Sequence, residues 1–563
     1  MAGAFRTTTA SIALPAALLA LSLLAVAVRS DTAAATPVTP STACNETTDP
    51  NFCRTVLPSN GTSNLYTYGR FSVAKSLSNA NKFLGLVNRY LSRRGAGGGL
   101  SAGAVAALQD CQLLSGLNID FLSSAGATLN TSANSALLDP QAEDVQTLLS
   151  AILTNQQTCA DGLQAAAAAW SVRDGLAVPM ANSTKLYSVS LSLFTRAWVR
   201  KSGKKSSGNN KPPHHGHGRG LFDATDDEVV RRMELEGAAA AVPVVGEVTV
   251  DQSGAGNYTT VGEAVAAAPT NLAGSSGYFV IRVAAGVYEE NVVVPRNRKY
   301  VMMIGDGIGQ SVITGNRSVV DGWTTFNSAT FAVLGTGFVA VNMTFRNTAG
   351  PAKHQAVALR SGADLSTFYR CSFEAYQDTL YAHSLRQFYR ACDIYGTVDY
   401  VFGNAAVVFQ GCRLLSRLPM QGQSNTVTAQ GRTDPNQNTG TTLQGCAVAA
   451  APDLAANAAF PVATYLGRPW KNYSRTVVMQ SEVDAVVDPA GWMPWDGDFA
   501  LATLFYAEFN NSGAGADTSR RVAWPGFHVL NTTADAGNFT VGNMVLGDFW
   551  LPQTGVPFTS GLN

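Results

Sequence analysis

The sequence has few charged residues and no net charge. Only 14% of its 563 residues are charged, and 39 basic residues balance 39 acidic ones. This balance excludes a strongly basic nucleic-acid-binding protein, and the 46% hydrophobic content excludes a disordered chain. The charge is uneven along the chain: residues 1–236 hold 20 basic and 16 acidic side chains, whereas residues 237–563 hold 19 and 23. A chain of this length is expected to form two or more domains.

Long apolar runs are absent except near the start of the chain. An apolar run extends from Ile12 to Val28 and has small residues at Ala25 and Ala27. This pattern predicts a secretory signal peptide over residues 1–30, with an uncleaved signal anchor as the alternative. No other stretch is long and apolar enough to span a bilayer, so we expect a secreted protein.

Cysteines are also few, but they fall into two even groups. The first group comprises Cys44, Cys53, Cys111 and Cys159, and the second comprises Cys371, Cys392, Cys412 and Cys446. Even numbers in each segment suit disulfides in an oxidising compartment. A Cys44–Cys53 bond would staple the start of the first segment, and a Cys111–Cys159 bond would join two helices. Eleven Asn-x-Ser/Thr sites fit a secreted glycoprotein.

Residues 44–200 are rich in Ala, Leu and Ser, and they show helical periodicity between Ser101 and Trp170. Apolar residues recur at intervals of three and four, as the run Val145, Leu148, Leu149, Ile152 and Leu153 illustrates. The spacing predicts amphipathic helices packed as an all-α four-helix bundle.

A basic linker is predicted over residues 201–237. Its run of Lys, Arg, Gly, Ser and Pro, KSGKKSSGNNKPPHHGHGRG, contains no acidic residue. The dibasic pair Arg231–Arg232 follows this run, at a position where a processing protease could cut.

From about Val242 onward the pattern changes to short β-branched and aromatic runs between turn residues, which predicts an all-β domain. These runs repeat: FYRCSFEAYQD ends at Asp378, and FYRACDIYGTVD ends 21 residues later at Asp399. A strand-containing repeat of this length is typical of a β-solenoid. A β-sandwich with regular hairpins is the alternative, but hairpins do not require like residues to recur at like positions.

In a solenoid, Asp378 and Asp399 would lie in neighbouring coils, about 4.8 Å apart. Two close carboxylates do not ionise together easily, so one could act as an acid while the other acts as a base or nucleophile. From the spacing alone, two turn aspartates that cap backbone amides are an equally good interpretation.

Five segments resemble the signature motifs of the pectin methylesterase family. They are GVYEE at 286–290, QAVAL at 355–359, YQDTL at 376–380, GTVDYVFG at 396–403 and LGRPW at 466–470. The similarity extends from about Val248 nearly to the C-terminus, with Tyr400 where the family usually has Phe. The resemblance implies that residues 238–563 form a right-handed parallel β-helix that hydrolyses the methyl esters of homogalacturonan in the cell wall, releasing methanol.

Residues 44–200 resemble the invertase and pectin methylesterase inhibitor family. The likeness rests on the paired cysteines and on DVQTLLSAILTNQQTCADG at 144–162. This tandem order is similar to that of plant enzymes with an inhibitor-like pro-region, which is cut off after a dibasic motif that is usually followed by Leu-Leu. Here Met233 and Glu234 follow Arg231–Arg232. We expect the helical segment to restrain the enzyme until the linker is cut.

The resemblance also implies roles for individual residues. Asp399 matches the nucleophile that forms an acyl-enzyme, and Asp378 matches the general acid that protonates methanol and then activates water. Gln355 and Gln377 match the donors to the oxyanion. Arg468 matches the cation that holds the nucleophile.

Substrate contacts and partners follow from the same resemblance. The residues that match or resemble substrate-binding positions are Trp470, Trp495, Phe402, Tyr381 and Thr325. Expected partners are methylated pectin, a processing protease and a proteinaceous inhibitor, with no nucleic acid, metal or organic cofactor, and the protein is expected to be a monomer. Proximity favours the pairs Cys371–Cys392 and Cys412–Cys446, although four cysteines allow three pairings.

Three other functions compete with an esterase. A β-helical pectin glycosidase of the inverting kind needs carboxylates about 6.5–9.5 Å apart, wider than adjacent coils allow. A calcium-dependent lyase would need a cluster of acidic ligands that the sequence does not show. A catalytically inactive inhibitor or wall-binding protein would be expected to lack a motif residue, and none is missing.

Overall fold

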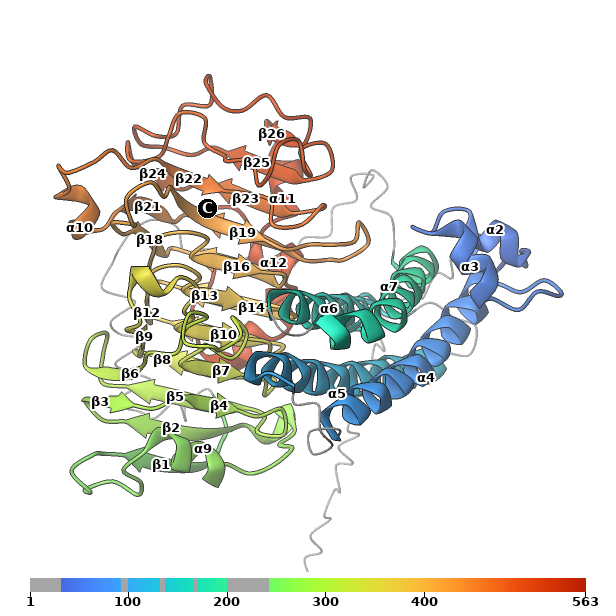
Figure 1. Cartoon of the computed structure of the whole chain (residues 1–563), viewed down its shortest axis with the longest axis horizontal. Helices are drawn as coiled ribbons and strands as arrows, with labels where there is room; N and C mark the ends of the chain where they lie inside the picture. The colour runs from blue at the N-terminus through green and yellow to red at the C-terminus, as the bar shows by residue number, and fades with distance from the viewer. Residues whose placement is uncertain (1–31, 93–99, 132–136, 167–169, 200–241) are drawn as a thin grey trace, which may run out of the picture.

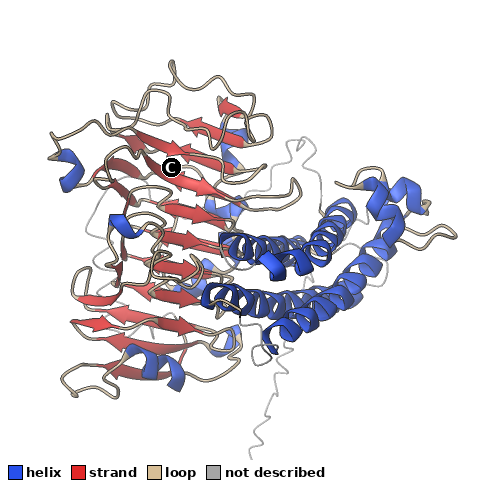
Figure 2. Ribbon diagram, viewed as in Figure 1, coloured by secondary structure: helices blue, strands red, loops and turns tan. Residues whose placement is uncertain are grey.

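The computed structural model describes residues 32–92, 100–131, 137–166, 170–199 and 242–563. The predicted signal peptide and the pair Arg231–Arg232 lie outside the described residues. Helices and strands are segregated along the chain: the long helices lie before residue 200, and the strands lie after residue 243 (Figure 2).

The N-terminal domain is the predicted four-helix bundle. Its long helices are α4 (Leu65–Ser92), α5 (Ala102–Thr131), α6 (Asp139–Ala165) and α7 (Trp170–Trp198), preceded by the short α1 (Thr32–Ala35), α2 (Pro40–Cys44) and α3 (Pro50–Val56). The periodic positions Val145, Leu149 and Ile152 of α6 are buried, as the sequence predicts. Both expected disulfides are present in this domain: Cys44–Cys53 fastens α2 to α3, and Cys111–Cys159 joins α5 to α6.

The C-terminal domain is a parallel β-helix, which confirms the solenoid and excludes the sandwich. Every strand pair in this domain is parallel, and most strands pair with the strand three places further along the chain. One sheet comprises β1 (Val244–Val250), β2 (Tyr278–Val283), β5 (Val301–Gly305), β8 (Val339–Val341), β11 (Ser366–Tyr369), β14 (Arg386–Arg390), β17 (Ala406–Gln410), β20 (Gly440–Gln444), β23 (Arg475–Met479), β25 (Phe505–Phe509) and β26 (Phe527–Val529).

Two further sheets complete each coil. The second comprises β4 (Val292–Val294), β7 (Phe331–Val333), β10 (Leu359–Ser361), β13 (Leu380–Ala382), β16 (Val401–Gly403), β19 (Asn425–Gln430) and β22 (Thr464–Gly467). The third comprises β3 (Gly286–Glu289), β6 (Ser311–Gly315), β9 (Thr344–Asn347), β12 (Ser372–Glu374), β15 (Asp393–Gly396), β18 (Arg413–Ser416), β21 (Ala447–Ala450) and β24 (Glu482–Val483). The short helices are α9 (Val261–Ala267), α10 (Pro452–Ala455), α11 (Thr533–Gly537) and α12 (Val541–Met544), with 3₁₀ turns at Gly274–Ser276, Pro351–Lys353, Gly547–Phe549 and Leu551–Thr554. Figure 1 shows the helical bundle against one side of the stacked coils.

Aromatic side chains stack inside the coils because equivalent positions repeat at the strand spacing. The ring of Tyr389 lies between those of Phe368 and Phe409, with centroid distances of 4.7 and 4.6 Å and near-parallel planes. Such pairs contribute about 0.5–1.5 kcal/mol each beyond the burial of their area. The repeat in the sequence therefore reflects the packing of the core, in which side chains at equivalent positions of successive coils stack on one another.

The predicted pairs Cys371–Cys392 and Cys412–Cys446 are wrong. All four thiols are free and buried. Each cysteine follows a residue of positive φ that turns the chain between two sheets, such as Ala391 at 51°, so the four side chains point inward in parallel. A disulfide needs side chains that converge on each other, which parallel neighbours in a stack do not. Each Sγ instead contacts a backbone carbonyl of the preceding coil, as Cys392 does with Phe368 at 3.4 Å.

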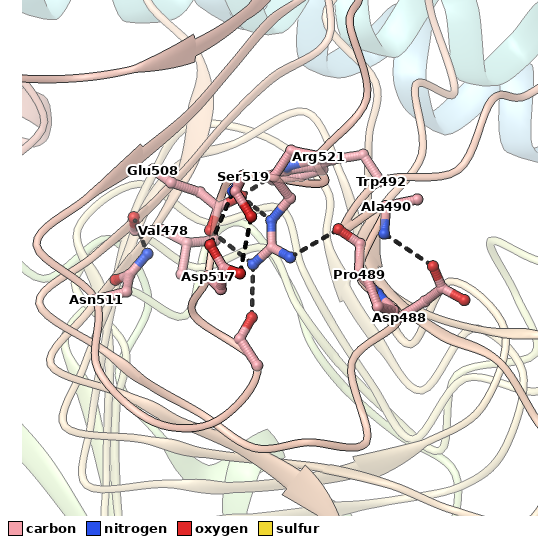
Figure 3. Close-up of polar contacts among 11 residues, drawn as sticks. Val478, Asp488, Pro489, Ala490, Trp492, Glu508, Asn511, Asp517, Ser519 and Arg521 are labelled. Carbon is pink, nitrogen blue, oxygen red and sulfur yellow. Dashed lines mark hydrogen bonds and ion pairs between the residues drawn. The ribbon is translucent and has the colours of Figure 1, made fainter.

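A buried ion pair secures the C-terminal end of the β-helix (Figure 3). Arg521 Nε donates to Glu508 Oε1 at 2.8 Å, and its Nη2 donates to Oε2 at 3.1 Å, with both side chains at most 2% exposed. The remaining guanidinium donors bind the carbonyls of Pro489 and Gly515, and Trp492 Nε1 donates to Glu508. These contacts fasten the loops before and after β25 to that strand.

Candidate active site

Strand register places Asp378 and Asp399 at equivalent positions in adjacent coils. Leu380 of β13 pairs with Val401 of β16. Asp378 lies two residues before Leu380, and Asp399 lies two residues before Val401. Both aspartates have positive φ, 61° and 53°, a conformation that Asp tolerates better than most residues. The next equivalent position along the stack is Thr426, because Val401 pairs with Thr428 of β19.

Asp399 is held in a fixed orientation by charge and hydrogen bonds. Arg468 donates from Nε to Oδ1 at 2.7 Å and from Nη2 to Oδ2 at 2.8 Å. Thr426 Oγ1 donates to the same Oδ1 at 2.7 Å and accepts from the Asp399 backbone N–H at 2.8 Å. The Arg468 guanidinium lies 4.4 Å from the Trp495 ring centroid. A bidentate guanidinium stabilises the carboxylate form of its partner.

Asp378 has a different environment. The equivalent position in the preceding coil is Val357, a fully buried apolar residue. Burial raises the pKa of Asp378 well above its ordinary value, the charge of Asp399 raises it further, and Arg468 opposes this only in part. Asp378 therefore keeps its proton at a pH at which an exposed aspartate is ionised.

The predicted catalytic and substrate-binding residues all line one cavity of about 730 Å³. They are Thr325, Gln355, Gln377, Asp378, Tyr381, Asp399, Phe402, Arg468, Trp470 and Trp495. Gln377 directly precedes Asp378, and Gln355 follows the 3₁₀ turn Pro351–Lys353. The cavity therefore brings together a protonated carboxyl group, a paired carboxylate and two amide side chains.

One wall of the cavity is aromatic. Tyr381 and Phe402 are register partners, and their rings stack with centroids 4.1 Å apart. Trp470 meets Phe402 edge-on at 6.0 Å. Such faces suit the apolar surfaces of sugar rings.

The comparisons with known proteins assign this domain. A family model described as Pectinesterase matches residues 247–548. The chain belongs to the pectinesterase family. A second model, described as plant invertase/pectin methylesterase inhibitor, matches residues 39–193.

Relatives with both domains confirm the tandem order expected of this pectinesterase. Probable pectinesterase/pectinesterase inhibitor 41 of Arabidopsis thaliana is 55% identical over 546 residues, which cover 93% of this chain and 94% of the relative. Probable pectinesterase/pectinesterase inhibitor 20 of the same plant is 55% identical over 537 residues, with coverage of 93% and 94%. The solved pectin methylesterase from carrot is 57% identical, with a TM-score of 0.54, and its match covers 56% of this chain and 98% of the carrot chain. The prediction of a pectin methylesterase that follows an inhibitor-like domain is confirmed.

The helical domain of the pectinesterase closes the cavity from the other side. The residues of this domain that line the cavity lie in α5, in α6 and directly after α6: Gly103, Asp110, Thr158, Asp161, Gly162, Gln164, Ala165 and Ala166. Thr158 Oγ1 lies 3.0 Å from His383 Nε2, and Lys471 Nζ lies 3.0 Å from Asp161 Oδ1. Buried residues of α4 to α7 also form one apolar cluster with the aromatic wall of the cavity.

A loop between β19 and β20 makes a second contact with the helical domain. Gln437 Nε2 donates to the Ser150 carbonyl at 2.8 Å, and Asn438 Nδ2 donates to Thr147 Oγ1 at 2.8 Å. Asn436 Nδ2 donates to Ser192 Oγ on α7 at 2.9 Å. This loop lies within the segment TAQGRTDPNQNTG at 428–440, so part of that segment contacts the helices.

Sequence reasoning missed Thr426, Lys471 and the helical residues of the cavity. Thr426 lies 27 residues after Asp399, because a longer loop separates β18 from β19, so the 21-residue repeat did not reveal it. No pattern in the helical segment indicates which helix face meets the second domain.

The described ranges lack two further features. These residues contain no group of three or more His, Cys, Asp or Glu side chains arranged to hold a metal ion. They also contain no helix with the length and apolar character needed to cross a membrane.

Proposed function

We propose that this pectin methylesterase acts through an acyl-enzyme on Asp399, with Asp378 as its acid and then its base. The observation that supports this most directly is the contrast between the two aspartates. Asp399 is a carboxylate paired with Arg468, and its neighbour Asp378 is a buried carboxyl group with a raised pKa. A nucleophile and an acid are thus available at the same pH.

In the first half-reaction, an Asp399 carboxylate oxygen attacks the ester carbonyl carbon of a methylated galacturonate. The carbonyl oxygen becomes an oxyanion, to which the side-chain amides of Gln355 and Gln377 donate hydrogen bonds. As the C–O bond to the methoxy group breaks, Asp378 gives its proton to the leaving oxygen and methanol departs. An anhydride links Asp399 to the substrate acyl group, and Asp378 is left as a carboxylate.

In the second half-reaction, Asp378 takes a proton from water, whose oxygen attacks the acyl carbon. The bond to Asp399 breaks, and the galacturonate carboxylic acid leaves and ionises. Asp378 has regained its proton and Asp399 its charge, so the site is ready for another ester. Arg468 holds the Asp399 side chain in position through both half-reactions.

The helical domain is proposed to inhibit the enzyme within the same chain. Residues of α5 and α6 cover the cavity that holds the two aspartates, which blocks the path of a polysaccharide. We further propose that the protein is secreted to the cell wall and that a protease removes the helical domain at Arg231–Arg232. Processing would make the aromatic wall formed by Tyr381, Phe402 and Trp470 accessible to pectin.

The test is Asp399→Ala in the segment 238–563. This segment is suitable because the solved carrot chain matches 56% of this chain, and the match covers 98% of the carrot chain, so a chain of about the size of the catalytic part alone has been solved as a folded structure. Methanol release from methylated pectin should fall by on the order of 10⁴-fold, since the nucleophile is lost. Asp517→Ala, at an exposed aspartate that does not line the cavity, is the matched control and should keep full activity. Activity of the Asp399 variant close to wild type, with unchanged circular dichroism, would overturn the mechanism; new reducing ends without methanol would indicate a glycosidase.

A further inference from the structure

The groove offers little positive charge to an anionic polymer. Among the described residues of the catalytic domain that line the cavity, Arg468 is the one cation. Its guanidinium is already paired with the Asp399 carboxylate. Residues 237–563 hold 19 basic and 23 acidic side chains, so no general attraction compensates. A substrate carboxylate must therefore find a specific partner at the edge of the cavity.

Lys471 is placed to be that partner. It directly follows Trp470 of the aromatic wall, and its Nζ lies 4.9 Å from the Trp470 ring centroid. The side chain is 19% exposed and lines a small recess, together with Tyr381 and His383, that adjoins the main cavity. The catalytic domain supplies no carboxylate to Lys471 within 4.0 Å among its described residues.

In the full chain, the helical domain provides the missing carboxylate. Asp161 Oδ1 lies 3.0 Å from Lys471 Nζ and accepts a second hydrogen bond from Gln157 Nε2 at 2.7 Å. The other oxygen, Oδ2, is buried and has no hydrogen-bond partner within the part of the chain that the structure describes. Asp161 also lines the main cavity, so a carboxylate is present beside Trp470.

We propose that Lys471 is a specificity-determining residue that binds the free carboxylate of a galacturonate unit next to the one being hydrolysed, and that Asp161 takes this place in the full chain. The proposal rests on the proposed function, which supplies the substrate. Asp399 and the two glutamines line the main cavity, whereas Lys471 lines the adjoining recess. The lysine therefore meets a neighbouring unit, where a carboxylate attracts it and a neutral methyl ester does not.

The experiment compares the wild-type segment 238–563 with Lys471→Met, which keeps the length of the side chain without its charge, and with Lys471→Arg. Lys299→Met is the matched control, because Lys299 does not line the cavity. Binding of an unesterified oligogalacturonate is measured by calorimetry. Methanol release is measured on two oligogalacturonides of equal length, one fully methylated and one partly de-esterified.

Lys471→Met should weaken binding of the unesterified oligomer by about 5- to 10-fold, as expected for one partly exposed charge pair. It should raise KM for the partly de-esterified substrate by a similar factor, leave kcat within about twofold, and leave KM for the fully methylated substrate unchanged. Lys471→Arg should restore most of the binding because it restores the charge, and Lys299→Met should have no effect.

An equal change in KM for both substrates, an effect of Lys299→Met as large as that of Lys471→Met, or unchanged binding in Lys471→Met would each overturn the proposal. The binding measurement needs no turnover. A wild-type segment that releases no methanol would therefore contradict the proposed function, while the binding comparison would still decide whether Lys471 recognises a carboxylate.

Discussion

The two domains of this chain are stabilised in opposite ways. The helical domain has four long helices that pack mainly against their neighbours in sequence, and two disulfides cross-link it. The β-helix has four free thiols and no disulfide among its described residues, and it relies on parallel ladders and stacked rings. Every proposed catalytic residue belongs to the β-helix. The comparison indicates that the helical domain covers a site to which it supplies none of the proposed catalytic residues.

The contacts between the domains support this difference. Besides the apolar cluster that the helices form with the aromatic wall, many of them are amide and hydroxyl hydrogen bonds, such as Asn404 Nδ2 to Thr154 Oγ1 at 2.9 Å and Gln437 to Ser150. Polar surfaces of this kind can return to water when the partner leaves, which suits an interface that is meant to separate.

Among the effects that test this comparison of the two domains, the largest comes from removing the helical domain. A tethered interface has an effective concentration in the millimolar range, so even an affinity of about 10 μM would close about 99% of molecules. Methanol release from pectin by the segment 238–563 should therefore exceed that of the full-length protein by on the order of 100-fold. The two proteins are assayed at equal molar concentration, and equal activities would refute autoinhibition.

The next effect tests how the β-helix is stabilised without disulfides. Arg521→Met leaves Glu508 buried without its partner and should lower the free energy of unfolding by about 3–5 kcal/mol, measured by urea titration of the segment 238–563. Arg282→Met, which removes a partly exposed pair with Glu247, is the matched control and should cost about 1 kcal/mol or less. Similar losses in both variants would show that burial of the Arg521 pair is unimportant.

A third prediction concerns the cross-links of the helical domain. The Cys111–Cys159 bond closes a loop of 48 residues, so replacing both cysteines with alanine should destabilise the helices by about 4 kcal/mol in the loop-entropy model. Thermal unfolding followed by circular dichroism at 222 nm should show the helical transition at lower temperature. A reductant should shift this transition and leave that of the β-helix unchanged; a shift of both would contradict the assignment of free thiols.

The smallest effect is a pH dependence of the interface. Burial raises the pKa of Asp110 to about 7, although a hydrogen bond from Thr324 and the charge of Arg360 oppose the shift. The docked state therefore favours the protonated carboxyl group. The contribution of Asp110 to docking is complete below the pKa of an exposed aspartate and is lost as the pH rises through about 7.

Activity of the full-length protein, relative to that of the segment 238–563 at the same pH, should thus rise several-fold between about pH 5 and pH 8. The asparagine side chain of the Asp110→Asn variant cannot ionise, so in this variant the activity ratio should change little with pH. A ratio that rises equally in the Asn variant would assign the pH dependence to other groups.

The sequence predicted the fold best where the coils have equal length. Asp378 and Asp399 were placed together because their coils match residue for residue, and the same regularity revealed the solenoid. The cysteine pairing failed because closeness along the stack does not supply the converging geometry of a disulfide. Lys471 and Asp161 could not be paired in advance, since their contact depends on how two separately folded domains meet.

The register around the aspartates has a consequence for how such an enzyme can diversify. From Asp378 the next equivalent residues follow after 21, 27 and 39 positions, at Asp399, Thr426 and Tyr465, yet all four remain in register. The extra residues lie in loops outside the strands. Insertions and deletions can therefore reshape the walls of the groove between lineages while the reacting atoms keep their spacing, so new polymer preferences can evolve without rebuilding the chemistry.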